Sequence, residues 1–280
     1  MNAQLSQNLA LNPGIAWQNS TGIKGVIARI STQTFYSIDK TTQADRPAEA
    51  YNPFYNPVLD TTLLSYRNTF RNTIFINRSY TKIAAEYTYQ NNRVKNLLLN
   101  GFQTDGIVSN LVSIRWNITT KYTIILGGDF GNDFSASDFI SDGNYKIQFQ
   151  KFLPEFRYQP NQYFRISING DITQKSNEDQ ELDQHAQIVG IGLESRFNMP
   201  SKGSLFANIK FSNIDYTGPD NTPSQVRMLE TLRPGLNLTW SLSWNQNLNK
   251  FLQLSINYNG RKSEDVAAIH VGGVQVRAFF

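Results

Sequence analysis

The sequence predicts an all-β protein, a transmembrane up-and-down antiparallel β-barrel of about 12 strands with short periplasmic turns and long extracellular loops. Three observations predict this fold class. Apolar and polar residues alternate over long segments, short and long connections take turns along the chain, and the chain ends on an aromatic residue within such a segment. A period of two indicates a strand with one apolar face.

The clearest alternation lies near the C-terminus. In residues 236–244 every second residue is Leu or Trp, and the residues between them are Asn, Thr or Ser. Residues 252–258 repeat the pattern with Leu, Ile and Tyr. A helix would spread these apolar residues around its surface, so both segments are predicted as strands. Similar alternation predicts strands around 83–89, 108–118, 122–130, 164–168 and 205–211, with weaker signals near 23–38 and 64–78. The phase slips at 150–154, which predicts a bulge near Pro154.

The connections between these segments fall into two kinds. Short connections are expected at 79–82, 119–121, 159–162, 200–203 and 245–250. Longer polar connections are expected between them, at 39–62, 91–105, 131–144, 174–184, 215–225 and 259–265. Because short and long alternate, the predicted sheet is a meander whose two ends differ.

Strand length distinguishes a membrane barrel from a propeller. Each period of roughly 40 residues would hold four short strands in a propeller blade. Here it holds two segments of about 11–15 residues, longer than strands of soluble sheets and sufficient to cross a bilayer. Aromatic residues also gather near both predicted strand ends, as in barrel girdles. Near the short turns these are Tyr80, Trp116, Tyr122, Phe156, Tyr158, Phe164, Phe197, Trp244 and Phe251; near the long loops they are Tyr66, Tyr89, Phe130, Tyr145, Tyr216 and Tyr258.

Composition excludes several kinds of site. The 280 residues contain no cysteine, so a disulfide framework or thiolate metal site is impossible, and two histidines argue against a zinc site. The net charge of +4 is small and the Lys and Arg residues are scattered, so no nucleic-acid partner is expected. An aromatic content of 12% argues against disorder. We expect no cofactor and no metal.

The N-terminal region carries no targeting signal. The first ten residues lack a basic start and an apolar run, and no stretch approaches the roughly 18 apolar residues of a membrane helix. A leader is therefore expected upstream, or already removed. Residues 1–22 look polar and unpatterned and are expected to be a linker, a plug or a partial strand. Residues 23–280 are expected to form the barrel.

The last residues set the predicted orientation. Val274, Val276, Ala278 and Phe280 share one face, opposite Gln275 and Arg277. This segment resembles the C-terminal signal strand of bacterial outer-membrane proteins, by which the barrel assembly machinery recognises them. The resemblance implies an integral outer-membrane location, outer-membrane lipids and the assembly machinery as partners, and other outer-membrane proteins as further candidate partners. Counting strands back from this end places every short turn on the periplasmic side.

Several segments are similar to the ends of large Bacteroidota outer-membrane proteins. They are Asn257-Tyr258-Asn259-Gly260-Arg261-Lys262-Ser263, Val274-Gln275-Val276-Arg277-Ala278-Phe279-Phe280, Phe75-Ile76-Asn77-Arg78-Ser79 and Leu98-Leu99-Asn100-Gly101-Phe102. The resemblance covers about the last 220 residues and carries no diagnostic catalytic motif. It implies that a long periplasmic portion precedes such a barrel.

Charged residues with the opposite parity to the apolar face are expected to line the lumen. They are Arg29, Glu86, Arg115, Asp129, Arg165, Glu194, Arg196, Lys210 and Arg277. Basic residues outnumber acids in this set, which predicts a mildly anion-tolerant pore if the lumen is open. The alternative is that these charges pair with one another as structural scaffolding in a plugged lumen.

Outer loops and histidines supply the remaining candidates. Tyr51, Phe54 and Tyr55 lie in a proline-rich stretch of the longest loop and are expected to bind a partner or occlude the lumen, unless the loop is merely rigid. Acidic residues at 177–183 and 129–142 follow no calcium-binding spacing and are interpreted as solvated. His185 has no obvious serine partner nearby, and His270 shares the lipid-facing parity, so no catalytic residue is assigned.

The sequence therefore predicts a non-enzymatic integral outer-membrane barrel that acts as a pore, a transport channel or a scaffold. The first alternative is a structural or partner-binding subunit of an outer-membrane complex for secretion, uptake or assembly, which includes a piece of a larger barrel. The second alternative is a barrel hydrolase. A converging His–Ser or His–Asp group near the outer rim would favour the hydrolase.

Overall fold

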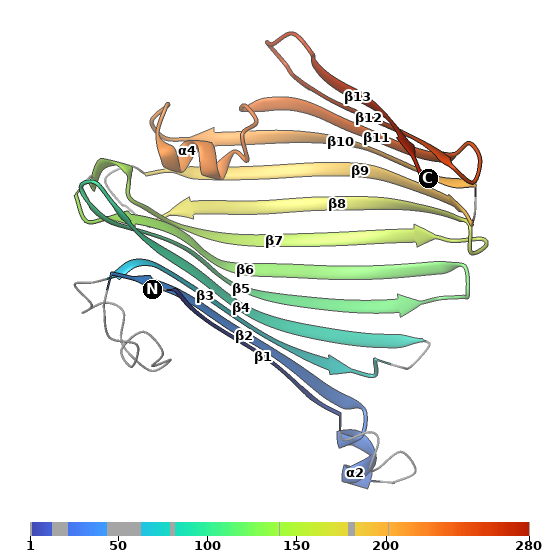
Figure 1. The fold of residues 1–280 in the computed structure, drawn as a ribbon, viewed down its shortest axis with the longest axis horizontal. Coiled ribbons are helices and arrows are strands. Elements are labelled where there is room, and N and C mark those ends of the chain that lie inside the picture. The colour runs from blue at the N-terminus through green and yellow to red at the C-terminus, as the bar shows by residue number, and fades with distance from the viewer. Residues whose placement is uncertain are drawn as a thin grey trace.

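The computed structural model describes residues 2–12, 22–43, 63–78, 82–139, 141–178, 183–200 and 202–279. These residues form one antiparallel sheet of 13 strands that follow one another in chain order (Figure 1). The strands are β1 (Asn2–Leu11), β2 (Ile30–Thr42), β3 (Leu63–Ile76), β4 (Ile83–Leu98), β5 (Gly101–Asn117), β6 (Tyr122–Ser137), β7 (Tyr145–Tyr158), β8 (Phe164–Asn177), β9 (His185–Met199), β10 (Gly203–Thr217), β11 (Gly235–Asn247), β12 (Leu252–Ser263) and β13 (Ile269–Ala278). The predicted all-β up-and-down meander is confirmed.

Little helix accompanies the sheet. The described helices are α2 (Gly22–Ile27) between β1 and β2, the 3-10 turn η2 (Ser141–Gly143) before β7, and α4 (Pro223–Met228) between β10 and β11. None of these helices is long and apolar enough to cross a bilayer. The α4 helix begins after Thr222, whose side-chain oxygen accepts a hydrogen bond from the backbone N–H of Gln225.

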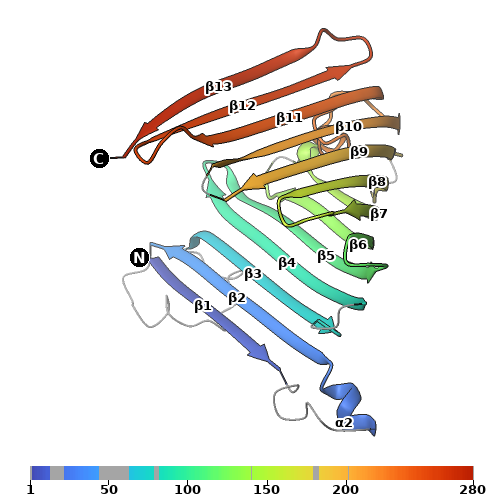
Figure 2. The same cartoon turned by 90° about the vertical axis from the view of Figure 1, so that its right-hand side faces the viewer.

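The sheet curls strongly but stays open among the described residues. In Figure 2, β1 lies at one edge of the curved sheet and β13 at the other, with the remaining strands between them. Adjacent strands of a sheet twist relative to one another, so twelve successive pairings bend it toward a barrel. The described residues therefore form a curved wall in which β1 and β13 do not pair with each other.

The strand count differs from the prediction at the N-terminus. The structure has 12 strands from β2 onward, as expected from residue 23, and adds β1 before them. Leu5, Leu9 and Leu11 share one face of β1, and each pairs across to a residue of β2 in an unbroken register. Residues 2–11 therefore alternate in the manner of a strand, although Gln7 interrupts the apolar face.

The strands are longer than predicted at the long-loop end. The segment 91–105, expected to be a polar loop, is a continuous hairpin in which Leu99 and Asn100 alone separate β4 from β5. Asn91 pairs with Val108 and Lys95 with Thr104 in one register. Polar side chains on the terminal part of these strands led to the wrong interpretation, because a strand that extends past an apolar environment no longer needs apolar residues.

The bulge predicted at Pro154 does not form. The β7–β8 ladder omits Leu153 and Pro154 and resumes in the same register, with Phe152 opposite Ile172 and Glu155 opposite Asn169. Proline has no N–H to donate, so the ladder loses its bonding here. A side chain at the facing Gly170 would meet the proline ring at 2.7 Å, so this glycine makes room for Pro154 inside the sheet.

Candidate functional site

The two faces of the sheet have different chemistry. The convex face carries Leu205, Ala207, Ile209 and Phe211 on β10, whereas Lys210 and its even-numbered neighbours point to the concave face. The register extends this division to the neighbouring strands, where Leu205 faces Phe197 and Trp244, and Ile209 faces Leu193 and Trp240. The result is a continuous apolar band on the convex face.

The convex apolar band stops before the strands end. On β10 the same face continues beyond Phe211 with Asn213, Asp215 and Thr217, all exposed. On β8 it continues beyond Ile172 with Gln174 and Ser176. The band therefore lies toward the short-turn end, and a polar rim follows it at the long-loop end.

Aromatic rings mark the short-turn end of the band. Tyr122 stacks on Tyr158 at 4.9 Å and on Phe156 at 6.1 Å between ring centroids, across the pairing of β6 with β7. This part of the predicted girdle is confirmed in position. Tyr145 and Tyr216 do not belong to the opposite girdle, because they pack against a buried cluster on the concave face. Tyr80 lies outside the described residues.

The concave face carries most of the predicted lumen charges, and several of them pair. The Glu194 carboxylate lies 2.8 Å from Arg196 and 3.4 Å from Arg165. Lys210 Nζ lies 2.5 Å from Asp171 Oδ2. The Glu194 pairs join adjacent strands or residues two apart on one strand, and Lys210 of β10 reaches over β9 to Asp171 of β8. All of them therefore line the wall rather than reach across an open space.

Of the other predicted lumen residues, some lie on the concave face and one does not. Glu86 and Arg115 lie on the concave face of β4 and β5, and Arg277 lies on that of the edge strand β13. Asp129 Oδ1 is shielded from solvent and has no hydrogen-bond partner among the described residues. Arg29 was placed wrongly: it is exposed in the turn between α2 and β2, at the short-turn end.

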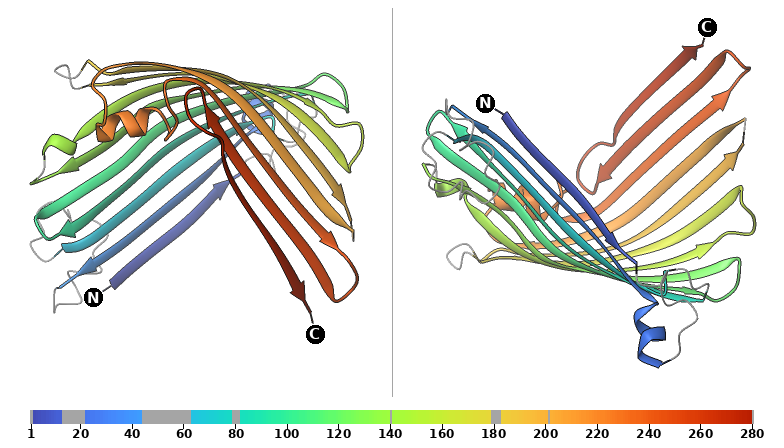
Figure 3. Two further views of the ribbon diagram at one scale, coloured as in Figure 1. Left: turned by 90° about the horizontal axis from the view of Figure 1, so that it is seen from above. Right: turned by 60° about the horizontal axis from the view of Figure 1, so that its bottom comes forward.

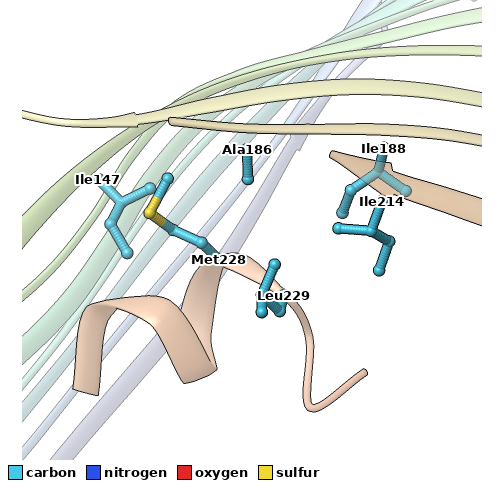
Figure 4. Close-up of a cluster of buried hydrophobic side chains, with 6 residues drawn as sticks. All are labelled: Ile147, Ala186, Ile188, Ile214, Met228 and Leu229. Atoms are coloured by element: carbon cyan, nitrogen blue, oxygen red, sulfur yellow. The ribbon is translucent and has the colours of Figure 1, made fainter. Parts of the chain in front are cut away.

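The α4 segment folds inward over the concave face. Figure 3 shows the helix beneath the arch of the sheet. Met228 and Leu229 are buried against Ile147, Ala186 and Ile188 of the sheet (Figure 4). Ile214 completes this cluster from β10, and Tyr145, Tyr216 and Leu232 pack around it. Burying an apolar side chain of this size stabilises a structure by about 1.5–3 kcal/mol, so the segment is held firmly in place.

Polar contacts fix the same segment. Lys175, only 8% exposed, donates to Met228 O at 2.9 Å and to Glu230 Oε1 at 2.8 Å. Arg227 forms an ion pair with Asp133 of β6. Gln184 donates to Thr222 Oγ1 at 2.8 Å and to the Tyr216 hydroxyl at 3.1 Å. We call residues 218–234, with these contacts, the inward loop.

Charge interactions shift the pKa values of two ionisable groups in the inward loop, Glu230 and Arg227. Burial works to raise the pKa of the Glu230 carboxyl, but the hydrogen bond and charge of Lys175 outweigh burial and lower that pKa. The hydrogen bond from Arg227 to Asp133 raises the pKa of the guanidinium. Both groups are therefore held in their charged forms at neutral pH.

A cavity of about 950 Å³ lies between the inward loop and the wall. Its lining combines apolar side chains with charges of both signs, namely Asp105, Asp129, Asp133, Lys151, Lys175, Arg227 and Glu230. Of these charged residues, sequence reasoning identified Asp129 as facing the lumen. Asp171, Lys151 and Lys175 could have been found from strand parity, because they share the face of Asp129 and Lys210. Arg227 and Glu230 could not have been found in this way, because nothing in the sequence of a loop shows that the loop folds inward.

The histidines and possible metal ligands do not converge. His185 Nε2 lies 3.1 Å from Asp183 Oδ1, but both side chains are exposed and only two residues apart. His270 Nδ1 lies 2.7 Å from the Tyr258 hydroxyl on the convex face. In the described ranges, no group of three His, Cys, Asp or Glu side chains could hold a metal ion.

Two further predicted groups lie wholly or partly outside the described residues. Tyr51, Phe54 and Tyr55 lie outside the described residues, so their role stays a prediction. Val274, Val276 and Ala278 do share the convex face of β13, opposite Ile256, Leu254 and Leu252. Phe280 lies outside the described residues, and the assembly role of this strand stays a prediction.

Known proteins resemble this chain in structure but not in sequence. No protein-family model matches the chain, and no curated protein matches it. Among solved structures it is similar to the translocator domain of the autotransporter NalP from Neisseria meningitidis, at 12% identity and a TM-score of 0.33. That match covers 100% of this chain and 87% of the other.

Proposed function

We propose that this chain forms the wall of an integral β-barrel of the bacterial outer membrane, and that its concave face lines a passage narrowed by the inward loop. The observation that carries the proposal is the division of the sheet into a convex apolar band and a charged concave face. A soluble sheet buries its apolar face, whereas here Ile191, Phe211 and Val189 remain 47–57% exposed. Lipid is the environment in which such a face is stable.

The polar rim supports one orientation. Strands that cross a bilayer at a tilt need about 9–11 residues, and β4 to β10 have 14 to 17. The surplus lies at the long-loop end, where the convex face turns polar. The long loops therefore project outside the cell and the short turns lie in the periplasm. We also propose that the chain comes from a Bacteroidota-type outer-membrane protein and that the barrel assembly machinery recognises β13.

The concave charges and the inward loop support passage of polar solutes through a restricted space. Positive and negative groups are paired along the wall, so the net bias toward anions expected from the sequence is weakened by Asp171, Asp133 and Glu230. The inward loop covers part of this wall and narrows the space in front of it. A passage of this kind selects by size and by contacts with both charge signs.

A non-enzymatic role is part of the proposal. Hydrolysis by a serine or histidine mechanism needs a nucleophile within hydrogen-bond reach of a base that a third group orients. The described contact of His185 is to the exposed Asp183, and that of His270 is to Tyr258 on the convex face. Neither contact supports the hydrolase alternative.

Extraction and conductance test the proposal together. Washing membranes with sodium carbonate should leave the chain in the membrane pellet, and the detergent-extracted protein should migrate differently on a gel before and after boiling. Inserted in a planar bilayer, it should give discrete conductance steps that rise when residues 220–231 are replaced by a short Gly-Ser linker. Release of the chain by carbonate would refute the membrane assignment. Conductance steps of unchanged size after the replacement would refute the narrowed passage.

A further inference from the structure

Both edges of the sheet lack a strand partner among the described residues. β1 pairs with β2 on one side and β13 pairs with β12 on one side, and each has a free side over its whole length. An unpaired backbone N–H or C=O group is strongly unfavourable in hydrocarbon, so a wall that spans a membrane must be covered at both edges. This step rests on the proposed function.

The two edge strands carry little that discourages pairing. Free edges of soluble sheets are protected by charges, proline or bulges. β1 has no charged residue and no proline, and the sole Arg or Lys in β13 is Arg277. Both strands keep an unbroken register with their neighbours, so neither has a bulge. These edges are therefore suited to accept another strand.

The convex apolar band continues to both edges. Leu9 and Leu11 on β1 are 51% and 55% exposed, and Val274 and Val276 on β13 are 69% and 61% exposed. An added sheet would have to continue the band with apolar residues on its own convex face. Its concave face would have to be polar, to match Ser6 and Asn8 on β1 and Gln275 on β13.

The odd strand number determines which kind of sheet can fill the gap. In an antiparallel meander the direction reverses at each strand, so β1 and β13 run the same way, from the long-loop end to the short-turn end (Figure 1). Direct pairing of β13 with β1 would therefore be parallel. Only an odd number of inserted strands allows every pair around the barrel to be antiparallel.

A second copy of the chain gives the same parallel junction. Copies related by an axis along the barrel keep their strand directions, so β13 of one copy would meet β1 of the next in parallel. An axis in the membrane plane would reverse the second copy and put its long loops in the periplasm. Single-chain bacterial barrels have even, fully antiparallel strand counts, which a 13-stranded ring would break.

We infer that β1 and β13 are docking edges for a partner β-sheet of an odd number of antiparallel strands, which is apolar on its convex face and completes the barrel. The partner is a separate polypeptide chain. Its strands next to β1 and β13 both run from the short-turn end to the long-loop end.

Disulfide cross-linking tests the absence of direct closure, and the chain offers no background cysteine. Ser6→Cys is combined with Val271→Cys, Gly273→Cys or Gln275→Cys in the protein in its native membrane, and each pair is oxidised. One intervening strand would separate the edges by about 10 Å, beyond the reach of a disulfide. We therefore expect no link within a chain and none between two differently tagged copies. Either link would overturn the inference.

Two pairs on the same strands serve as matched controls. Ser6 lies opposite Ser37, and Ser255 lies opposite Gln275. Ser6→Cys with Ser37→Cys and Ser255→Cys with Gln275→Cys should both form disulfides under the same oxidation. Their formation shows that the sheet is folded and that the edge cysteines can react.

Photo-cross-linking identifies the partner. Benzoylphenylalanine replaces Ser6 or Gln275, and the linked peptides are sequenced by mass spectrometry. We expect both positions to link to one polypeptide outside residues 1–280, within segments that alternate apolar and polar residues. A gain in mass on a gel shows that the partner is a distinct subunit, and a link without such a gain would overturn the inference. Links to residues 1–280 only, or to lipid only at either edge, would overturn the inference.

Failure of this inference can be told apart from failure of the proposed function. If the chain stays in carbonate-washed membranes while β1 links directly to β13, the membrane role stands and the partner sheet is refuted. If carbonate releases the chain, the proposed function itself has failed.

Discussion

Single residues show how this sheet tolerates side chains that would otherwise break it. Gly170 leaves room for the ring of Pro154, and Gly260 lies beneath the indole of Trp240 on the convex face. At Gly260 an added Cβ would overlap the Trp240 ring. An aromatic ring that covers a strand glycine restores packing that the glycine lacks.

Gly260→Ala is expected to destabilise the sheet by about 1–3 kcal/mol, because Trp240 must leave its position. Gly273→Ala on the next strand is the control, since nothing lies within 4 Å of its added Cβ. Urea unfolding of the membrane-extracted protein, followed by tryptophan fluorescence, measures both. Adding Trp240→Leu to Gly260→Ala should recover stability; equal midpoints for the two alanine variants would refute the overlap.

Acidification is expected to release the inward loop through Glu230. Because the pKa of this carboxyl is lower in the folded protein, its contribution is complete above the unfolded value of about 4.3. That contribution is lost as the pH falls through the lower folded value. A fluorophore on Val226→Cys, an exposed α4 position, should change emission in that window. The same probe in Glu230→Gln should show a smaller transition there; an unchanged transition would exclude Glu230 as the cause.

Among the elements, α4 departs most from what the sequence shows. A short polar loop segment of this type is expected to lie in solvent. Instead, Met228 is fully buried, and Lys175 of β8 donates a hydrogen bond to its backbone oxygen. An apolar cluster on the concave face explains this, because Ile147, Ile188 and Ile214 would otherwise face water.

Lys175→Met should loosen the inward loop without unfolding the wall. The substitution removes the donor to Met228 O and the partner of Glu230, and since Glu230 is partly exposed we expect a loss of about 1–2 kcal/mol in docking free energy. Labelling of Met228→Cys by a thiol reagent should then speed up about tenfold. Lys146→Met, which removes the exposed pair with Glu178, is the control and should leave the labelling rate unchanged.

Sequence patterns predicted the strands well wherever apolar and polar residues alternate along them. β5 to β13 follow apolar alternation, and the short turn before Tyr122 is held by Thr119 Oγ1 as a turn of that length requires. The same reasoning failed for the polar ends of β4 and β5, because strand pairing continues past the apolar band. For β1 it left a linker, a plug and a partial strand as alternatives, because Gln7 interrupts the apolar face. Docking of α4 depends on tertiary contacts between residues more than 50 positions apart, such as Lys175 and Met228.

At the scale of the whole molecule, the described residues form a curved wall with two different faces and two edges that lack a strand partner within that part of the chain. The convex band, the polar rim and the charged concave face follow from one strand register, so a shift by one residue would exchange the faces. This consistency favours a membrane barrel over a soluble sheet. It also makes the position of the band along each strand a quantity that can be measured.

Cysteine scanning of β10 tests the central claim most directly. Single cysteines at residues 205–217 of the membrane-embedded protein are reacted with a water-soluble thiol reagent, with no native cysteine to interfere. We expect protection at Leu205, Ala207, Ile209 and Phe211, greater reactivity at Asn208 and Lys210, and high reactivity at Asn213, Asp215 and Thr217. Protection at alternate positions that ends after Phe211 would support a lipid-facing band. Equal reactivity on both faces, or protection that extends to Thr217, would contradict it.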